Sequence, residues 1–192
     1  MLKHSTADQP LIPVAGIGAS AGGLEAISEL LEALPSDLGL AYLIVSHMDP
    51  RHESHLAEIL EKRTSISVVE AKPQVIQPDH AYIIPPDTVM TLSGNELVLS
   101  ARQKSGGKHL PIDALFNSIA RERPENGICI VLSGTGSDGT QGIKHIKEAT
   151  GITIAQEPTS AAFDGMPLSA IETGCVDRVL RPFEIARELA KV

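Results

Sequence analysis

The sequence predicts a doubly wound α/β domain, with helices on both faces of a mainly parallel sheet. Two observations carry this prediction: short apolar runs alternate with amphipathic segments of helical period, and glycine-rich turns follow two of the apolar runs. A third observation is the length of 192 residues, which suits one domain with a full hydrophobic core.

The chain opens in the order strand, helix, strand, helix. Apolar runs at residues 13–17 and 40–46 predict buried strands. Residues 22–34 and 53–63 carry Leu and Ile at helical spacing, and Pro35 ends the first of these helices. This order is that of parallel βαβ units.

The middle of the chain departs from this alternation. Strands are expected at residues 67–71, 81–84, 89–92 and 96–100. Ser93-Gly94-Asn95 separates the last two and is a good hairpin turn, so these two strands should pair antiparallel. Residues 102–108 are polar and contain glycine, which predicts a loop of the kind that forms a mobile flap.

The alternation resumes near residue 112. Helices are expected at residues 112–121, 140–149, 167–173 and 182–190, and strands at 127–133, 152–156 and 176–180. The prediction is therefore a three-layer α/β/α, Rossmann-like domain over residues 13–192, with an antiparallel β-hairpin inserted in a mainly parallel sheet. Residues 1–12 are expected to form a flexible N-terminal segment.

Composition argues against several classes of partner. The formal net charge is −8 and only 3% of residues are aromatic, which argues against nucleic acid as the main partner. No apolar run approaches the roughly 20 residues of a membrane span, so no membrane insertion is expected. Cys129 and Cys175 both lie in apolar stretches and are interpreted as buried thiols, which predicts a reducing compartment and a cytoplasmic location.

The glycine-rich turn after the first strand has three interpretations. Residues 16–21 fit the G-x-G-x-x-G/A fingerprint of dinucleotide-binding loops. Gly18-x-Ser20-x-Gly22 fits the nucleophile elbow, in which a tight strand-to-helix turn exposes a serine hydroxyl. The turn could equally be a simple one in which Ser20 caps the following helix. Its own residues leave the choice open.

Two other loops favour nucleophilic catalysis. A dinucleotide site wants an acid near the end of the second strand, but that strand ends in Ser46-His47, with no acid before Asp49. A histidine there can act as general base for a serine on the neighbouring turn. Asp138, among three glycines in residues 134–139, could orient the imidazole, and nearby N–H groups could stabilise an oxyanion. The alternative is a helix cap in a phosphate-binding loop, although the loop lacks a Gly-Lys-Ser/Thr ending.

A metal site is disfavoured. His47, His52 and His55 could donate to a metal, with Glu53 between them, but their spacing matches no common zinc motif. A metal is therefore not expected.

Taken together, the motifs resemble one family. They are IGASAGG at residues 17–23, SHM at 46–48, HAYIIPP at 80–86, LPID at 110–113, LSGTGSDG at 132–139 and FDGMP at 163–167. In this order and spacing, they look like the catalytic domain of CheB-type protein-glutamate methylesterases. The resemblance runs from about residue 14 to 189.

The resemblance implies a Ser–His–Asp triad of Ser20, His47 and Asp138. It implies hydrolysis of glutamyl methyl esters on the cytoplasmic helices of chemoreceptors, with release of methanol, and for many members deamidation of receptor glutamines. No cofactor is implied. Nucleotide- or phosphate-binding modules and catalytically degenerate regulatory domains are the competing hypotheses.

The resemblance also implies pocket residues and a setting. Ala21, Thr135, Gly136 and Met166 are expected around the oxyanion, with the N–H of Thr135 as a candidate donor. CheB response regulators usually have Thr where this chain has Ala21. The short segment before the first strand is not a phospho-receiver domain, and the motif variants resemble instead the methylesterase domain fused to a CheR-type methyltransferase, which is an expected partner.

Overall fold

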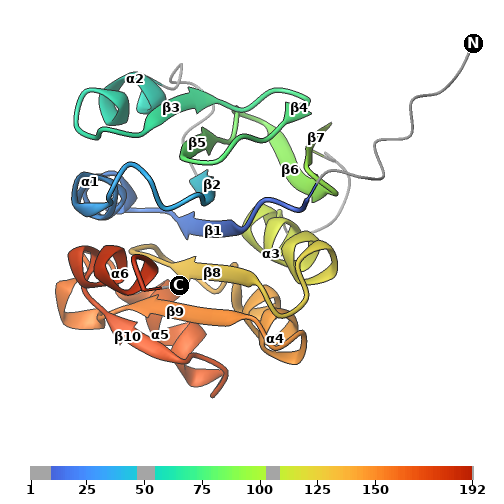
Figure 1. The fold of residues 1–192 in the computed structure, drawn as a ribbon. Helices are drawn as coiled ribbons and strands as arrows, with labels where there is room; N and C mark the ends of the chain where they lie inside the picture. The colour runs from blue at the N-terminus through green and yellow to red at the C-terminus, as the bar shows by residue number, and fades with distance from the viewer. Residues whose placement is uncertain (1–9, 47–54, 103–108, 192) are drawn as a thin grey trace, which may run out of the picture.

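A seven-stranded sheet forms the centre of the computed structural model, which describes residues 10–46, 55–102 and 109–191. The strand order is β10-β9-β8-β1-β2-β5-β3, and every pairing in this sheet is parallel (Figure 1). The strands are β1 (Val14–Ala19), β2 (Ala41–Ser46), β3 (Ser67–Glu70), β5 (His80–Ile83), β8 (Gly127–Val131), β9 (Ile152–Gln156) and β10 (Arg178–Leu180). The doubly wound α/β prediction is confirmed.

Helices cover both faces of the sheet because each buries one apolar stripe on it. One core cluster joins the sheet to α1 (Gly23–Ala33), α2 (Leu56–Glu61) and α6 (Pro182–Leu189). A second cluster joins the opposite face to α3 (Pro111–Glu122), α4 (Thr140–Glu148) and α5 (Gly165–Glu172). In Figure 1, α1 and α6 lie to one side of the strands and α3 and α4 to the other.

The inserted hairpin is part of a small antiparallel sheet. Strands β6 (Thr88–Ser93) and β7 (Glu96–Ala101) pair across the predicted turn, and β4 (Gln74–Val75) pairs with β7. Two residues give no periodicity to read, so the sequence did not reveal β4. The inner face of this small sheet packs into the core cluster that contains α3, through Met90, Leu92 and Leu97.

One buried arginine fastens the hairpin turn to the rest of the domain. The Arg123 guanidinium donates to the carbonyls of Ile12 (2.8 Å) and Gly94 (2.9 Å) and to Asn95 Oδ1 (2.8 Å). The Asn95 amide in turn donates to the carbonyl of Pro10 at 3.0 Å. Arg123 is only 3% exposed, and these bonds satisfy its buried N–H groups. They also tie the start of the described chain to the hairpin. Residues 1–9 lie outside the described residues.

Several element boundaries differ from those expected. The strand expected at residues 127–133 ends at Val131, although the N–H of Leu132 still donates to the carbonyl of Gly18 on β1. The helix expected from residue 167 begins at Gly165, and the strand expected from residue 176 begins at Arg178. Of the helix expected at residues 53–63, Leu56–Glu61 is described, and residues 53 and 54 lie outside the described part.

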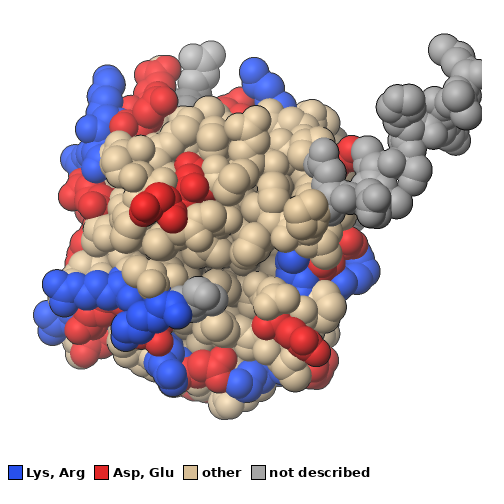
Figure 2. Space-filling view, viewed as in Figure 1, with Lys and Arg blue, Asp and Glu red and all other residues tan. Residues whose placement is uncertain are grey.

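Charged side chains are mixed in sign on the surface. On the face seen in Figure 2, Lys and Arg lie among Asp and Glu around the rim, and the centre is mostly uncharged. Ion pairs such as Arg181–Glu157 (2.9 Å) and Lys191–Glu188 (2.8 Å) account for part of this mixing. Within the described ranges, no helix has both the length and the apolarity needed to cross a bilayer.

We predict that Gly18→Ala destabilises the domain, because α3 packs directly on β1 at this position. A Cβ atom there would lie 2.4 Å from a methyl group of Ile112, which is fully buried. Overpacking of this kind costs about 1–3 kcal/mol, measurable by urea unfolding. Gly165→Ala is the control, since its Cβ would make only ordinary contacts from 3.4 Å outwards. An unchanged unfolding free energy for Gly18→Ala would contradict the close packing.

Candidate active site

Three neighbouring strands bring the predicted site residues to one edge of the sheet. β1 lies between β2 and β8, with Ala19 opposite Ser46 and Gly18 opposite Val131. The chain winds towards β2 on one side of β1 and returns to β8 on the other, so the carboxyl end of β1 lies at the switch point where such sheets bind ligands. Ser20 follows β1 directly. His47 follows Ser46 in the sequence and lies outside the described residues.

Ser20 lies in a tight turn between β1 and α1. Its N–H donates to the carbonyl of Ser133 and its own carbonyl accepts from the N–H of Gly23, both at 2.9 Å. Gly22 has a φ of +69°, and a Cβ there would lie 2.7 Å from that of Ala162, so the turn requires glycine. Gly22 is the N-cap of α1, and no side chain caps this helix. Ser20 therefore lies in a tight strand-to-helix turn and is not the N-cap of α1.

Met166 packs beside the nucleophile turn with its side chain. The N–H of Gly134 donates to the carbonyl of Phe163 (3.0 Å), and the N–H of Met166 donates to the carbonyl of Gly134 (2.9 Å). A Cβ on Gly134 would lie 2.3 Å from Met166 Sδ and 2.9 Å from Ser20 Cβ. Met166 is fully buried, so it shapes the surroundings of Ser20 by contact while its N–H bonds to the scaffold.

Asp138 is held by the first turn of α3. Its side chain is buried, and its two oxygens accept the N–H groups of Ile112 (3.0 Å) and Asp113 (2.9 Å). The Asp113 carboxylate in turn accepts the N–H of Gly142, in the first turn of α4, at 2.8 Å. Each acid thus satisfies N–H groups at the start of the other's helix, which would otherwise be unpaired. This exchange fixes the orientation of the Asp138 carboxylate.

The surroundings of Asp113 affect its titration. Burial raises the pKa of Asp113 above its ordinary value. The N–H groups of Gly142 and its neighbours oppose that rise in the Asp113 pKa, and the nearby Asp138 carboxylate adds to it. The reciprocal hydrogen bonds therefore hold two carboxyl groups close together inside the domain.

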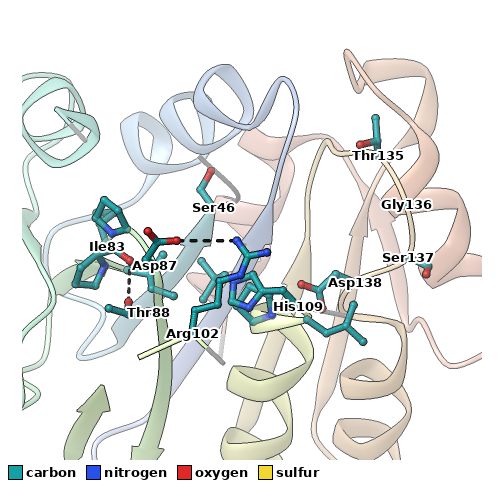
Figure 3. Close-up of a pocket in the computed structure, with 16 residues that line it drawn as sticks. Ser46, Ile83, Asp87, Thr88, Arg102, His109, Thr135, Gly136, Ser137 and Asp138 are labelled. Atoms are coloured by element: carbon teal, nitrogen blue, oxygen red, sulfur yellow. Dashed lines mark hydrogen bonds and ion pairs between the residues drawn. The ribbon is translucent and has the colours of Figure 1, made fainter. Parts of the chain in front are cut away.

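Asp138 lines a cavity of about 520 Å³ at this edge of the sheet. Thr135 and Gly136 form part of one wall, and both are exposed. Figure 3 shows Arg102 reaching into the cavity from the end of β7, with His109 between it and Asp138. The Arg102 guanidinium lies 3.9 Å from Asp87, on the far side from Asp138. The cavity thus offers both basic and acidic groups beside the predicted orienting acid.

The predicted site residues fall into two adjoining groups. Thr135, Gly136 and Asp138 line the cavity. Ser20, Ala21 and Met166 are not among its described lining residues and surround the loop that begins at Ser133. Ser46 connects the groups, because it lines the cavity and its Oγ would lie 3.8 Å from a Cβ on Gly23.

The structure also adds residues that the sequence argument missed. Asp113 fixes the partner helix, and Ser133 and Gln156 form a buried polar network behind Ser20. Both Asp113 and Ser133 lie inside motifs quoted for the resemblance, but nothing in the motif spacing distinguished their roles. The Asp87–Arg102 pair joins the two ends of a hairpin, which no local pattern signals.

The cysteine interpretation needs one correction. Cys129 is fully buried and burial raises the pKa of its thiol, but Cys175, in the segment between α5 and β10, is only partly buried. Both are free thiols. Of the histidines considered for a metal site, His47 and His52 lie outside the described residues, and His55 is exposed beside Glu58.

Comparison with known proteins identifies the family. The model of the CheB methylesterase family matches residues 15–189, which is nearly the whole chain. The chain belongs to the CheB methylesterase family. This agrees with the resemblance carried by the sequence motifs; a fusion to a CheR-type methyltransferase is not shown.

Relatives include longer proteins and a solved catalytic domain. A protein-glutamate methylesterase/protein-glutamine glutaminase of Photorhabdus laumondii is 40% identical over 182 residues, covering 92% of this chain and 52% of the relative. An uncharacterized 104.1 kDa protein of Rhodobacter capsulatus is 43% identical over 126 residues, 65% of this chain and 13% of that protein. The crystal structure of the Thermotoga maritima CheB methylesterase catalytic domain superposes with a TM-score of 0.85 at 28% identity, covering 93% of this chain and 97% of that one. The chain thus spans about half the length of the curated methylesterases it matches.

We predict that Asp113 makes stability fall as the pH rises above about 4. Its raised pKa means that the folded state binds its proton more tightly than the unfolded state does. The contribution is therefore fully present below the unfolded pKa and is lost as the pH rises through the folded one. The measurement is urea unfolding of the wild type and of Asp113→Asn between pH 4 and 8. As the pH rises, the unfolding free energy of the wild type should fall relative to that of the variant. Equal slopes would contradict the prediction.

Proposed function

We propose that this domain is a protein-glutamate methylesterase with Ser20 as its nucleophile. The observation that carries the proposal is the placement of Ser20 on a tight strand-to-helix turn, one strand away from the end of β2 and one from the loop that holds Asp138. Membership of the CheB methylesterase family supports the same chemistry. Family resemblance assigns the general base to His47. This residue follows Ser46 in the sequence, and Ser46 on β2 pairs with Ala19 on β1.

The proposed reaction proceeds in two stages. Ser20 Oγ attacks the carbonyl carbon of a glutamyl methyl ester while His47 takes the hydroxyl proton. His47 returns this proton to the departing methoxide, so that methanol leaves and an acyl-enzyme forms. His47 then deprotonates a water that attacks the acyl carbon, and returns the proton to Ser20 Oγ as glutamate is released. Asp138, held by two N–H groups, orients the imidazole through these steps.

Main-chain N–H groups are the proposed oxyanion donors, and the structure limits which ones can serve. The N–H groups of Ser20, Gly134 and Met166 already donate to carbonyl oxygens of the scaffold. In contrast, the Ser20 carbonyl points to the N–H of Gly23 and its peptide bond is trans, so the N–H of Ala21 points the opposite way. We assign the oxyanion hole to the N–H of Ala21 with that of Thr135, whose residue lines the cavity beside Gly136.

The proposed substrate is a methylated glutamate on a cytoplasmic helix of a chemoreceptor, which places the domain in the cytoplasm. The cavity of about 520 Å³ beside Asp138 has room for a side chain presented by a second protein, and Ser46, which lines it, connects it to the nucleophile turn. A glutamine side chain could undergo the same acyl chemistry with ammonia in place of methanol, as the name of the Photorhabdus laumondii relative indicates for that protein. A CheR-type methyltransferase, which would make the ester, is a proposed partner.

We predict that Ser20→Ala abolishes methanol release from methylated receptor and leaves the fold intact. Without the hydroxyl no acyl-enzyme can form, so the rate should fall by at least about 10³-fold. The measurement is methanol release under single-turnover conditions, with circular dichroism to check the fold. Ser36→Ala, at an exposed serine beyond α1, is the control. Undiminished release by Ser20→Ala would overturn the assignment, and tight nucleotide binding without esterase activity would favour the binding-module alternative.

We predict that Asp138→Asn lowers kcat by about 10³–10⁴-fold, because an amide can hold the imidazole in the wrong tautomer. The amide oxygen can still accept one of the two N–H groups of α3, so the domain should fold. Asp113→Asn is the matched comparison, since this carboxylate also accepts a helix N–H but belongs to the other half of the exchange. Equal losses of kcat in the two variants would mean that Asp138 acts only through the fold.

A further inference from the structure

Ser133 holds the nucleophile turn at two points. Its carbonyl accepts the N–H of Ser20 at 2.9 Å, and its hydroxyl donates to the carbonyl of Ala21 at 2.8 Å. The Ser20–Ala21 peptide lies between these two bonds, and it carries the N–H assigned above to the oxyanion hole. One fully buried side chain therefore restrains both the nucleophile and that N–H.

The same hydroxyl also binds a third segment. Ser133 Oγ accepts the N–H of Phe163 at 3.0 Å. The carbonyl of Phe163 lies at 3.3 Å from Oγ, but a hydroxyl has one proton and the carbonyl of Ala21 is nearer. Phe163 in turn accepts the N–H of Gly134, and Gly134 accepts that of Met166. Ser133 thus joins the nucleophile turn to the segment that places Met166 against Ser20.

Gln156 holds Ser133 from the other side. Its Oε1 accepts the N–H of Ser133 at 2.8 Å, at the point where β9 ends. Its Nε2 donates to the carbonyl (3.1 Å) and the hydroxyl (3.2 Å) of Ser160, in the short 3₁₀ helix Pro158–Ser160. Both ends of the buried amide are therefore bonded, which fixes its orientation and leaves Ser133 little freedom to move.

We propose that Ser133 is a positioning residue for catalysis: its hydroxyl sets the place of Ser20 Oγ and the direction of the Ala21 N–H. The inference rests on the proposed function of Ser20. Without the hydroxyl, the carbonyl of Ala21 loses its donor and the N–H of Phe163 loses its acceptor, so the turn can relax. A displacement of about 1 Å in an active site can cost about 10²-fold in rate.

Ser118 offers a matched control for the structural effect of losing a buried hydroxyl. It is 2% exposed, donates to the carbonyl of Leu115 at 2.7 Å and accepts the N–H of Leu92 at 2.9 Å. The pattern of one carbonyl acceptor and one N–H donor is that of Ser133. Ser118, however, joins α3 to β6 and contributes nothing to the nucleophile turn.

The test compares Ser133→Ala, Ser133→Thr and Ser118→Ala. For each we would measure kcat and KM for methanol release, the rate at which a fluorophosphonate modifies Ser20, and the unfolding temperature. In Ser133→Ala, kcat and the modification rate should fall together by about 10–100-fold with KM within about threefold. Ser118→Ala should lose a similar amount of stability at unchanged kcat, and Ser133→Thr, which keeps a hydroxyl, should recover most of the rate. If Ser133→Ala does not fold, Ser133→Cys keeps a weaker donor and should lower kcat less.

Three results would overturn the proposal: unchanged kcat in folded Ser133→Ala, an effect on KM alone, or an equal loss of kcat in Ser118→Ala. The fluorophosphonate rate separates this proposal from the proposed function. A wild type that is labelled at Ser20 in a Ser133-dependent manner but releases no methanol would contradict the methylesterase assignment and support the positioning role. Labelling that ignores Ser133 would contradict the positioning role, and a wild type that neither reacts nor hydrolyses would overturn both.

Discussion

The site depends on a reciprocal interaction between the starts of α3 and α4: the carboxylates of Asp138 and Asp113 each accept N–H groups from the first turn of the other's helix. Asp138 precedes α4 and binds the first turn of α3, while Asp113 lies in α3 and binds the first turn of α4. Helix starts carry unpaired N–H groups and a partial positive charge, so an acid at each is favourable although the two acids repel. Because neither helix can shift without breaking the other's bonds, the Asp138 carboxylate keeps its direction beside the cavity.

The loop after β8 combines this restraint with a second one. Ser133 at its start binds the nucleophile turn, and Asp138 near its end is bound by α3. One short segment therefore holds both Ser20 and Asp138 in position. Gln156, at the end of β9, anchors this segment by accepting the N–H of Ser133. The site is assembled from separate strands, so the loops that follow them must be held in a fixed relation to one another. Here the parallel pairing of β1 with β8 sets the distance, and the loop sets the directions.

The sequence was sufficient for the fold class and for expecting the loops after β1 and β8 to lie side by side. Apolar runs alternating with helical patterns led to the parallel sheet, because burial on both faces makes parallel strands apolar throughout. It was not sufficient for the polar network, because Ser133 and Gln156 are hydrophilic residues at positions that look like strand ends. Their roles depend on bonds to residues far along the chain, such as Ala21 and Ser160, and no local period encodes those. β4 escaped notice for a simpler reason, since two residues have no period.

The network also bears on Ala21, where CheB response regulators usually have a threonine. The absent hydroxyl would matter if the side chain at this position held the turn. In this chain, each described hydrogen bond of the turn involves main-chain atoms of the turn itself: the N–H and carbonyl of Ser20 and the carbonyl of Ala21. Every residue other than proline supplies these groups. The polar side chain that restrains the turn comes instead from Ser133, on the neighbouring loop, so alanine at position 21 leaves the geometry of the nucleophile intact.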